Sequence, residues 1–221
     1  MLENIIKSRR SISQFKNKKV SRKVIDELIE IASYAPSSCN TQPWFFLVFD
    51  DQKSKQQLNN FISKGYDLTK KDIMSKYKIL GKIYIRILTF FENYGTFDEA
   101  PVYILLFARE YDTPLFSQAL KVSKYTPIQK VADNSVITST AMAMQNFTLI
   151  AHKRGLGTRV KDGIKFLQNF KKLEQGLYKE FKIPKKYTLI SGIQLGYPTS
   201  KALERKVPKK LPLNKIRRYM K

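Results

Sequence analysis

The sequence predicts an α+β protein with few strands and many helices. Three short apolar segments have the length and the Pro, Gly or Asp boundaries of buried strands: WFFLVF at 44–49, VYILLFA at 102–108 and YTLISGIQLG at 187–196. Longer segments between them repeat apolar residues every three to four positions, which is typical of one buried face of a helix. With 221 residues, 43% of them hydrophobic, the chain can bury a substantial core. We therefore expect a single domain over residues 1–221.

The chain is expected to begin with two helices. Residues 2–10 carry apolar side chains at near-helical spacing. Ser21 is a suitable N-cap for the second helix, because its hydroxyl can accept a hydrogen bond from a free backbone N–H. Pro36 ends that helix. The shared apolar face of the second helix consists of Val24, Ile25, Leu28, Ile29 and Ala32.

The rest of the chain is predicted to be mostly helical. A short helix is expected over residues 54–64, and the lysine-rich segment 65–98, which also carries many apolar residues, indicates either a helix pair or a mobile lid. A long helix is expected to start at Asp133, and Gly155 supplies its C-terminal stop. The basic, proline-containing tail at 199–221 is expected to extend over a partner subunit.

The chain is strongly basic, with a formal net charge of +23. Residues 111–221 hold 23 of the 41 lysine and arginine residues but only 6 of the 18 acidic residues. Such a field attracts nucleic acid, acidic membrane surfaces or phosphorylated small molecules, and charge alone does not choose among them. A lysine-rich genome composition produces the same excess without any function.

The cysteine and histidine content excludes several classes of protein. One cysteine and one histidine are too few for a disulfide framework, or for a structural zinc site, which takes about four sulfur or nitrogen ligands. The opening MLENIIKSRRS has no apolar run before its charges, and the longest apolar runs are too short to cross a bilayer. We therefore expect a cytoplasmic protein without a signal peptide or a membrane span.

Several common catalytic patterns are incomplete in this sequence. Any Ser/His or Cys/His pair would have to use His152, which lies near a helix end beside two cations and is expected to be exposed. The segment GLGTRV at 155–160 lacks the third glycine of a dinucleotide-binding loop and follows a helix instead of a strand. No phosphate-binding loop ending in Gly-Lys-Ser/Thr occurs.

Two polar segments remain as candidates for a binding site. Arg9, Arg10 and Ser11 place guanidinium groups beside a hydroxyl, which suits a phosphate monoester, although a solvated basic helix end is the simpler alternative. The segment APSSCNTQPW at 35–44 is longer and richer in hydrogen-bonding groups than a connection requires. It is either a binding loop or a well hydrogen-bonded connection.

Together, these segments resemble the nitroreductase family of FMN-dependent NAD(P)H oxidoreductases. The opening RRSISQFKNKKVSRKVIDELIEIASYAPSSCNTQPWFFLVF is similar to the family's N-terminal signature, in which an arginine-serine start is followed by a helix, PSSxNxQPW and a strand. AMAMQNFTLIAHKRGLGT is similar to the family's central helix and the turn after it, and YTLISGIQLGYP to its final core strand. Residues 50–98 and 110–130 match poorly.

The resemblance implies a nitroreductase-like mixed central sheet flanked by helices, in a domain-exchanged homodimer with FMN at the subunit interface. In the family, the first motif holds the flavin phosphate and ribityl chain, a role that falls here to Arg9, Arg10 and Ser11. A loop from the other subunit lies against the isoalloxazine ring. The corresponding loop residues here are Pro36, Ser37, Ser38, Asn40 and Gln42.

Five further positions follow from the same resemblance. Backbone N–H groups at Asp162 and Gly163 correspond to those that contact flavin N5. Asn93 corresponds to an asparagine that touches the pyrimidine in some members. Lys206 and Lys210 correspond to basic residues that complete the phosphate site in one branch of the family, where arginine is more usual.

One departure concerns the charge near the flavin. Ser13, which we include among the cofactor-binding residues, stands where the family often has a basic residue near flavin N1 and O2. Positive charge there stabilises the anionic reduced flavin. The sequence therefore predicts a flavin that is harder to reduce than in members with the basic residue.

The resulting hypothesis is an oxidoreductase that transfers a hydride from NAD(P)H through flavin N5 to nitroaromatic or quinone-type acceptors by a ping-pong mechanism. Solvent can deliver protons, so no catalytic side chain and no metal is assigned. Reductive dehalogenation and flavin fragmentation, which occur in the same superfamily, are the enzymatic alternatives. The non-enzyme alternative is a basic nucleic-acid-binding protein that stacks bases on its aromatic residues.

Overall fold

A computed structural model describes residues 2–93, 100–111, 118 and 126–220, with the side chains at 78, 79, 90–93 and 126 outside the description. Asn93 is the last residue of a helix, and its backbone is described but its side chain is not. The predicted contact of Asn93 with the flavin pyrimidine stays a prediction. Residues 94–98, which belong to the predicted lid segment, also lie outside the described residues.

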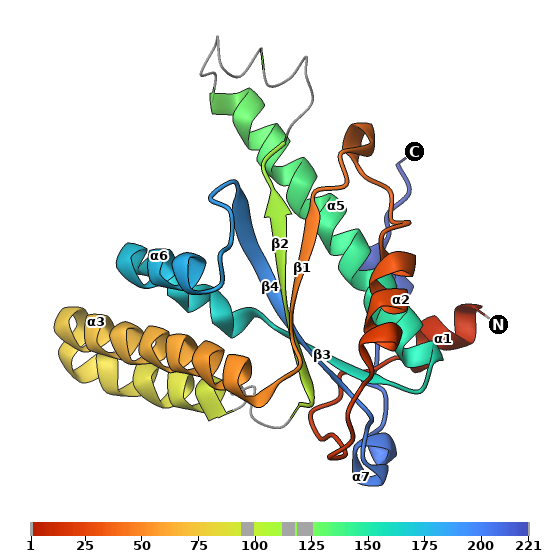
Figure 1. Cartoon of the computed structure of the whole chain (residues 1–221), viewed down its shortest axis with the longest axis horizontal. Helices are drawn as coiled ribbons and strands as arrows, with labels where there is room; N and C mark the ends of the chain where they lie inside the picture. The colour runs from red at the N-terminus through yellow and green to blue at the C-terminus, as the bar shows by residue number, and fades with distance from the viewer. Residues whose placement is uncertain (1, 94–99, 112–117, 119–125, 221) are drawn as a thin grey trace.

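A four-stranded sheet in the order β1-β2-β4-β3 forms the centre of the protein (Figure 1). Its strands are β1 Trp44–Phe49, β2 Val102–Arg109, β3 Gly157–Lys161 and β4 Tyr187–Gly196. All three strand pairs are antiparallel, and a single parallel bridge joins Ser11 to Thr158. The predicted α+β class is confirmed.

Helices cover both faces of this sheet (Figure 1). One face carries α2 Arg22–Ala32 and α5 Thr126–Lys153, and the other carries α3 Gln52–Asn93, η2 Asp162–Asn169 and α6 Lys171–Glu180. Strand β2 serves both cores because its side chains alternate between the faces: Ile104 packs with the α2 and α5 cluster, whereas Leu105 and Phe107 pack with the α3 and α6 cluster. This explains the continuous apolar run in its sequence.

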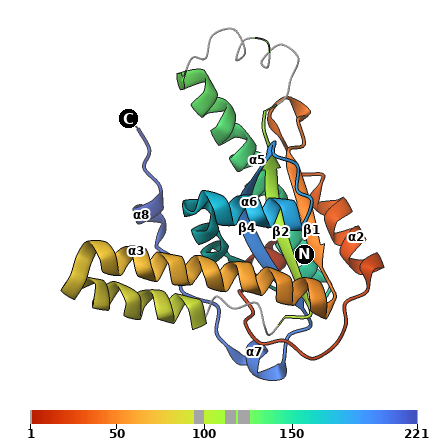
Figure 2. The same cartoon turned by 60° about the vertical axis from the view of Figure 1, so that its left-hand side comes forward.

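Helix α3 differs from the short helix predicted over 54–64. It continues to Asn93 and doubles back on itself, so that two helical arms lie side by side (Figures 1 and 2). The rings of Tyr77 and Tyr84 are 5.9 Å apart between centroids, whereas seven residues of a straight helix rise about 10 Å. The predicted helix pair is therefore present, and a role as a lid stays a prediction.

Two other elements also depart from the sequence prediction. Helix α5 begins at Thr126 instead of Asp133, and Pro127 at its first turn fits a position where the backbone N–H needs no helical partner. Its predicted stop is confirmed, because Gly155 has a φ of 72°. Strand β3, Gly157–Lys161, was not predicted, since its sequence GTRVK is polar and short.

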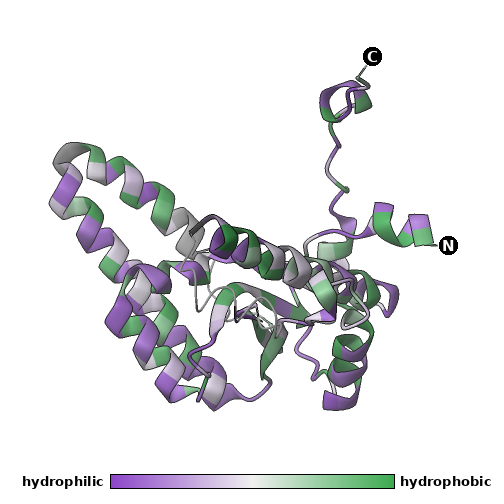
Figure 3. Cartoon of the chain, turned by 90° about the horizontal axis from the view of Figure 1, so that it is seen from above, coloured by the Kyte–Doolittle hydropathy of each residue, from purple (hydrophilic) through white to green (hydrophobic). Residues whose placement is uncertain are grey.

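The two ends of the chain are peripheral. Helix α1, Leu2–Ser8, has no buried residue and packs on α5. After α7, Ser200–Glu204, the tail leaves the body of the protein and carries α8, Leu213–Ile216 (Figure 3). Tyr219 and Met220 are 75% and 84% exposed. Within the described residues, no helix has the length and apolarity needed to cross a membrane.

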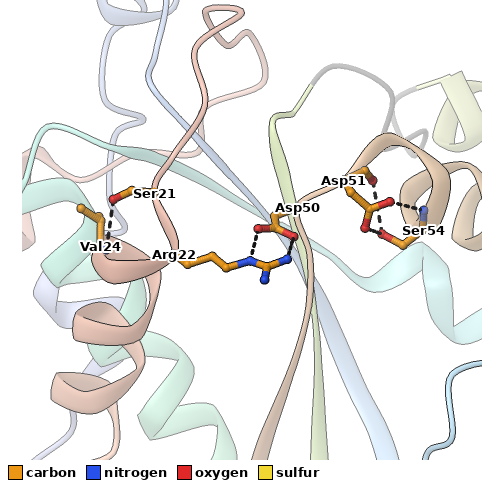
Figure 4. Close-up of polar contacts among 6 residues, drawn as sticks. All are labelled: Ser21, Arg22, Val24, Asp50, Asp51 and Ser54. Carbon is orange, nitrogen blue, oxygen red and sulfur yellow. Dashed lines mark hydrogen bonds and ion pairs between the residues drawn. The ribbon is translucent and has the colours of Figure 1, made fainter.

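Helix α2 is anchored at its first turn (Figure 4). Ser21 accepts a hydrogen bond from the Val24 N–H, as predicted for an N-cap. The guanidinium group of Arg22 donates to both carboxylate oxygens of Asp50, at 2.6 and 2.9 Å. This bond lowers the pKa of the Asp50 carboxyl. Since Asp50 directly follows β1, the contact fixes the start of α2 against the sheet.

Candidate functional site

A cationic cavity of about 520 Å³ lies where three distant segments meet. The first follows α1, the second is β3, and the third follows α7. Six of the lining side chains are cationic and none is acidic, so the cavity favours an anionic ligand. The lining residues are Arg9, Arg10, Ser11, Ser13, Arg159, Val160, Arg205, Lys206, Pro208 and Lys210.

Backbone pairing holds the first of these segments against the sheet. The Ile12 N–H donates to the Thr158 carbonyl at 2.9 Å, and the Lys16 N–H donates to the Tyr197 carbonyl at 2.7 Å. The Ile12 side chain is buried above Gly157, where an added Cβ would lie 2.7 Å from it. Ser11 and Ser13 flank Ile12 and, with alternate side chains on opposite sides, line the cavity.

Arg9 and Arg10 have different surroundings within this cavity. Arg10 Nη2 donates to the Leu203 carbonyl near the end of α7, so part of its guanidinium group holds the tail. Its buried Nε has no hydrogen-bond partner among the residues that the structure describes. Arg9 and Ser11 also line an adjoining cavity of about 130 Å³, with Gln145 and Thr148 of α5. The structure thus brings the predicted phosphate-binding residues together with Lys206 and Lys210.

His152 lies beside the start of this segment and is half-buried, which corrects the expected exposure. Its Nε2 is 2.8 Å from the Ser8 hydroxyl. Burial lowers the pKa of the imidazole, and the charges of Arg9 and Arg10 lower it further. Helix packing of α1 on α5 causes the burial, and nothing in the local sequence indicates it.

Three residues of the APSSCNTQPW loop have a left-handed backbone conformation. Cys39, Asn40 and Gln42 have φ values of 50°, 51° and 44°, in the left-handed region that costs a non-glycine residue about 1–2 kcal/mol. Ser37 Oγ accepts from the Gln42 N–H at 3.1 Å, which closes the loop on itself. Such outliers cluster at functional sites, and here they are fixed by specific contacts.

Contacts to α5 and to Tyr111, two residues after β2, fix the middle of this loop. The Ser38 N–H donates to Ser139 Oγ at 3.4 Å, and Ser38 Oγ lies 3.3 Å from the Tyr111 hydroxyl. Pro36, Ser37 and Ser38 line a cavity of about 420 Å³ together with residues of α5. The α5 residues are Val131, Asn134, Ser135, Thr138, Ser139 and Met142. Asn40 and Gln42 are exposed and do not line it.

The loop cavity and the cationic cavity are separate within one chain. The loop cavity is lined by α5 residues up to Met142, whereas the lining of the cationic cavity contains no α5 residue. The small cavity that adjoins it at Arg9 and Ser11 is lined by α5 residues from Met144 onward. One chain therefore presents the two predicted halves of the site in different places.

The predicted N5-contacting residues lie at the junction of β3 and η2. Asp162 Oδ1 accepts from Ser191 Oγ at 3.0 Å and lies 3.3 Å from Lys165 Nζ. A Cβ added to Gly163 would lie 2.2 Å from the Tyr66 hydroxyl, so only glycine fits there. Asp162 and Gly163 do not line the loop cavity, the cationic cavity or the small cavity beside Arg9.

Sequence reasoning missed two cationic residues of the cavity, Arg159 and Arg205. Arg159 belongs to the unpredicted strand β3, and Arg205 directly follows α7. The only signal for Arg159 was its place directly after the family-like segment GLGT, and the only signal for Arg205 was its place directly before Lys206.

Comparison with known proteins gives consistent matches. The nitroreductase family model matches residues 6–197. "Putative NAD(P)H nitroreductase YfhC" of Bacillus subtilis (strain 168) is 27% identical over 198 residues, which cover 90% of this chain and 84% of that protein. The iodotyrosine deiodinase of Hydra vulgaris is 32% identical over 104 residues, which cover 47% of this chain and 37% of that protein.

Solved structures share the fold. The BluB-like flavoprotein from Clostridium difficile 630 superposes with a TM-score of 0.80 at 25% identity, covering 100% of this chain and 99% of that one. A nitroreductase with bound FMN from Desulfitobacterium hafniense DCB-2 has a TM-score of 0.67 at 16% identity, covering 100% and 98%.

Gly157→Ala tests how the cationic cavity is held. The new methyl group would meet the buried Ile12 side chain and push the Ser11 to Ser13 segment from the sheet. We expect a loss of about 1–3 kcal/mol in the free energy of unfolding, as for other overpacked sites, together with weaker binding of a phosphate monoester. Urea denaturation and isothermal titration calorimetry measure the two effects.

Gly155→Ala is the matched control. A Cβ at this position has no atom within 4 Å, but the φ of 72° makes alanine unfavourable. This variant should lose about 1–2 kcal/mol of stability and keep its affinity for the phosphate monoester. Equal losses of affinity in the two variants would contradict the specific role of Gly157.

Proposed function

Because the chain belongs to the nitroreductase family, we propose that it is an FMN-dependent oxidoreductase that uses NAD(P)H to reduce nitroaromatic or quinone-type acceptors. The observation that carries this proposal is the cationic cavity in which Arg9 and Ser11 meet Lys206 and Lys210. The flavin-binding relatives of the same fold support it. Since NAD(P)H is an anion held inside cells, we propose that the enzyme acts in the cytoplasm.

The residues of the cationic cavity fit a phosphate monoester. Arginine can donate two parallel hydrogen bonds to phosphate oxygens, and Ser11 adds a hydroxyl. Arg10 adds a second guanidinium charge to the lining, while its Nη2 donates to the Leu203 carbonyl. In our proposal Arg9 and Ser11 anchor the phosphate, and the two lysines neutralise its remaining charge.

The loop at 36–42 fits a flat aromatic ring. Pro36 offers an apolar surface, while Ser37 and Ser38 offer polar groups around it in a cavity of about 420 Å³. FMN, when bound, supplies two-electron redox chemistry by accepting and giving up a hydride. The contribution of the protein is to orient the ring on this loop and to place the Asp162 and Gly163 N–H groups beside its N5.

We propose that the complete site forms between two copies of the chain. The separation of the loop cavity from the cationic cavity supports this, because each copy can offer one half to the other. Exposed apolar side chains on α5 and on the tail support it too, since a second copy can cover them. These residues are Val131, Ile137, Met142, Leu211, Leu213, Ile216, Tyr219 and Met220.

Reductive dehalogenation is the second candidate reaction. The partial match to a deiodinase favours this reaction. The doubled α3 exposes Tyr77, Leu80 and Ile83, which are apolar side chains that a halogenated aromatic substrate could contact. Reduction of simple quinones by NAD(P)H would favour the first reaction, and halide release from halophenols would favour the second. Oxygen-dependent loss of bound FMN would indicate flavin fragmentation.

The flavin proposal is tested first by absorbance spectroscopy of the purified protein. We expect flavin bands near ~450 nm and ~370 nm that bleach with anaerobic NAD(P)H. Arg9→Ala should weaken FMN binding about 10- to 100-fold, the equivalent of a charge-assisted hydrogen bond worth about 1.5–3 kcal/mol. Lys209→Ala removes a cation from the same segment as the cavity but outside its lining, and it should bind FMN normally.

A colourless protein that gains no bands with FMN would overturn the flavin proposal. Salt-dependent DNA binding by such a protein would favour the nucleic-acid alternative. Against that alternative, aromatic residues such as Phe45, Phe107 and Phe147 pack in the core of the structure.

Mixed dimers test whether the site is shared between chains. Arg9→Ala impairs the phosphate half, and Ser38→Trp fills the loop cavity. At an FMN concentration too low to load Arg9→Ala, each variant alone should lack FMN. A co-expressed mixture should then hold FMN in about a quarter of its chains, because half of the two-fold dimers are mixed and each has one intact site. A site contained within one chain would leave the mixture free of flavin.

Ser13→Arg tests the missing positive charge. The side chain of Ser13 lines the cationic cavity, so arginine there should raise the flavin midpoint potential on the order of 30 mV, or ~1.4 kcal/mol for a two-electron couple. Gln14→Arg adds the same charge at an exposed position outside the cavity and should change the potential less. An unchanged midpoint in Ser13→Arg would contradict the predicted effect.

A further inference from the structure

Building on the proposed function, we propose that His152 is a positioning residue for the bound phosphate. It holds Ser8, and through Ser8 the adjacent Arg9 to Ser11 segment, and it takes up a proton when a phosphate dianion binds there. The inference concerns the phosphate group itself, so it applies equally to free inorganic phosphate and to a flavin phosphate.

The hydrogen bonds around Ser8 define the role of the imidazole. Ser8 Oγ lies 2.6 Å from the Asn4 carbonyl and 2.8 Å from His152 Nε2. A hydroxyl has one proton, and a carbonyl can only accept, so the Ser8 proton goes to Asn4. His152 Nε2 must therefore carry hydrogen and donate to Ser8. Both the neutral Nε2–H tautomer and the imidazolium can do so.

This contact joins two elements where the phosphate segment begins. Ser8 is the last residue of α1, and Arg9 follows it directly. His152 belongs to the last turn of α5, the same helix that supplies Gln145 and Thr148 to the cavity beside Arg9. The hydrogen bond therefore fixes the direction in which the chain leaves α1 toward the cavity.

The charges around His152 make its protonation sensitive to an anion. In the free protein, burial and then the charges of Arg9 and Arg10 lower its pKa, with no carboxylate of the described residues contributing. The C-terminal end of α5 favours the protonated form of His152, but the positive charges of Arg9 and Arg10 disfavour that form. A phosphate dianion between those arginines reverses the sign of the local field. The pKa of His152 must then rise, and a proton is taken up on binding.

Several other charged groups lie on the helices and the strand around His152, and some of them form ion pairs with each other. On α1, Lys7 pairs with Glu3 at 3.3 Å. Between α2 and α5, Glu27 pairs with Arg154, two residues beyond His152. Lys153 on α5 is exposed, and Arg159 of β3 lines the cationic cavity. Arg9 and Arg10 are thus the charged groups of the described residues that lower the pKa of His152, and a bound anion opposes both.

Three variants separate the hydrogen bond from the proton. His152→Gln keeps an N–H donor at about the same reach but does not titrate. His152→Ala removes both donor and charge, and Ser8→Ala removes the acceptor. We expect His152→Gln to bind FMN within about twofold of wild type at pH 8, whereas the two alanine variants should bind about fivefold more weakly, the equivalent of one hydrogen bond.

The pH dependence of binding distinguishes positioning from general stability. The second ionisation of a phosphate monoester near pH 6 affects every variant equally. The ratio of wild-type to His152→Gln affinity removes that effect. This ratio should grow in favour of wild type as the pH falls from about 8 to 6, up to about tenfold for each unit by which the phosphate raises the pKa. A constant ratio would contradict proton uptake.

Nuclear magnetic resonance gives the direct test, because His152 is the only histidine in the sequence. The chemical shift of the His152 C2–H proton is followed as a function of pH in protein that carries no added histidines. The titration is repeated without ligand and with inorganic phosphate, FMN or riboflavin. We expect FMN and inorganic phosphate to raise the His152 pKa and riboflavin, which lacks the phosphate, to leave it unchanged.

The outcomes separate the two proposals. FMN bound at full occupancy with an unchanged His152 pKa, or an equal rise with riboflavin, overturns the role of His152 and leaves the flavin proposal standing. A rise with inorganic phosphate in a protein that binds no flavin supports the role of His152 and overturns the flavin proposal. No rise with either phosphate ligand overturns the inference.

Discussion

The backbone pairing of the segment after α1 with the edge of the sheet is the contact on which the rest of the site depends. The Ile12 N–H to Thr158 carbonyl bond fixes this segment beside β3. Farther on, Phe15 bridges to Pro198, and the Thr199 N–H donates to the Gln14 carbonyl. The N-terminal segment thus holds both β3 and the start of the tail.

This pairing explains why the cationic cavity contains residues from both ends of the chain. Arg9 and Lys206 are almost two hundred positions apart, yet both line it. Like charges repel, so six cations converge only because backbone hydrogen bonds and the buried Ile12 compensate for their repulsion. A bound anion therefore stabilises the folded protein, because it reduces the repulsion among the six cations that bind it.

The sequence predicted the buried elements better than the edges. Strands β2 and β4 are apolar runs because they lie between two layers of helices, and the edge strand β1 is apolar because its alternate side chains also pack into both layers. Strand β3 escaped prediction because an edge strand beside a cationic cavity carries Arg159 and Lys161 instead of apolar residues. Helix α3 was cut short in the prediction because Gly65 and the lysines after it interrupt its apolar face.

The candidate site follows the same division between local and tertiary information. Arg9, Arg10 and Ser11 are adjacent in sequence, so their shared chemistry was visible before the fold was known. Their meeting with Lys206 and Lys210 of the tail was expected only from the family resemblance, and their meeting with Arg159 was not expected, because it arises from strand pairing far along the chain. The half-buried position of His152 also depends on how α1 packs on α5, which composition and periodicity do not encode.

The left-handed residues of the 35–44 loop have a consequence for the thermodynamics of recognition. Cys39, Asn40 and Gln42 are held in this conformation by contacts within the chain. Their backbone entropy is therefore lost on folding and not at the moment a ligand arrives. A ring that meets this loop therefore encounters a surface whose backbone conformation is already set, which favours selectivity by fit to that contour over adaptation to each ligand.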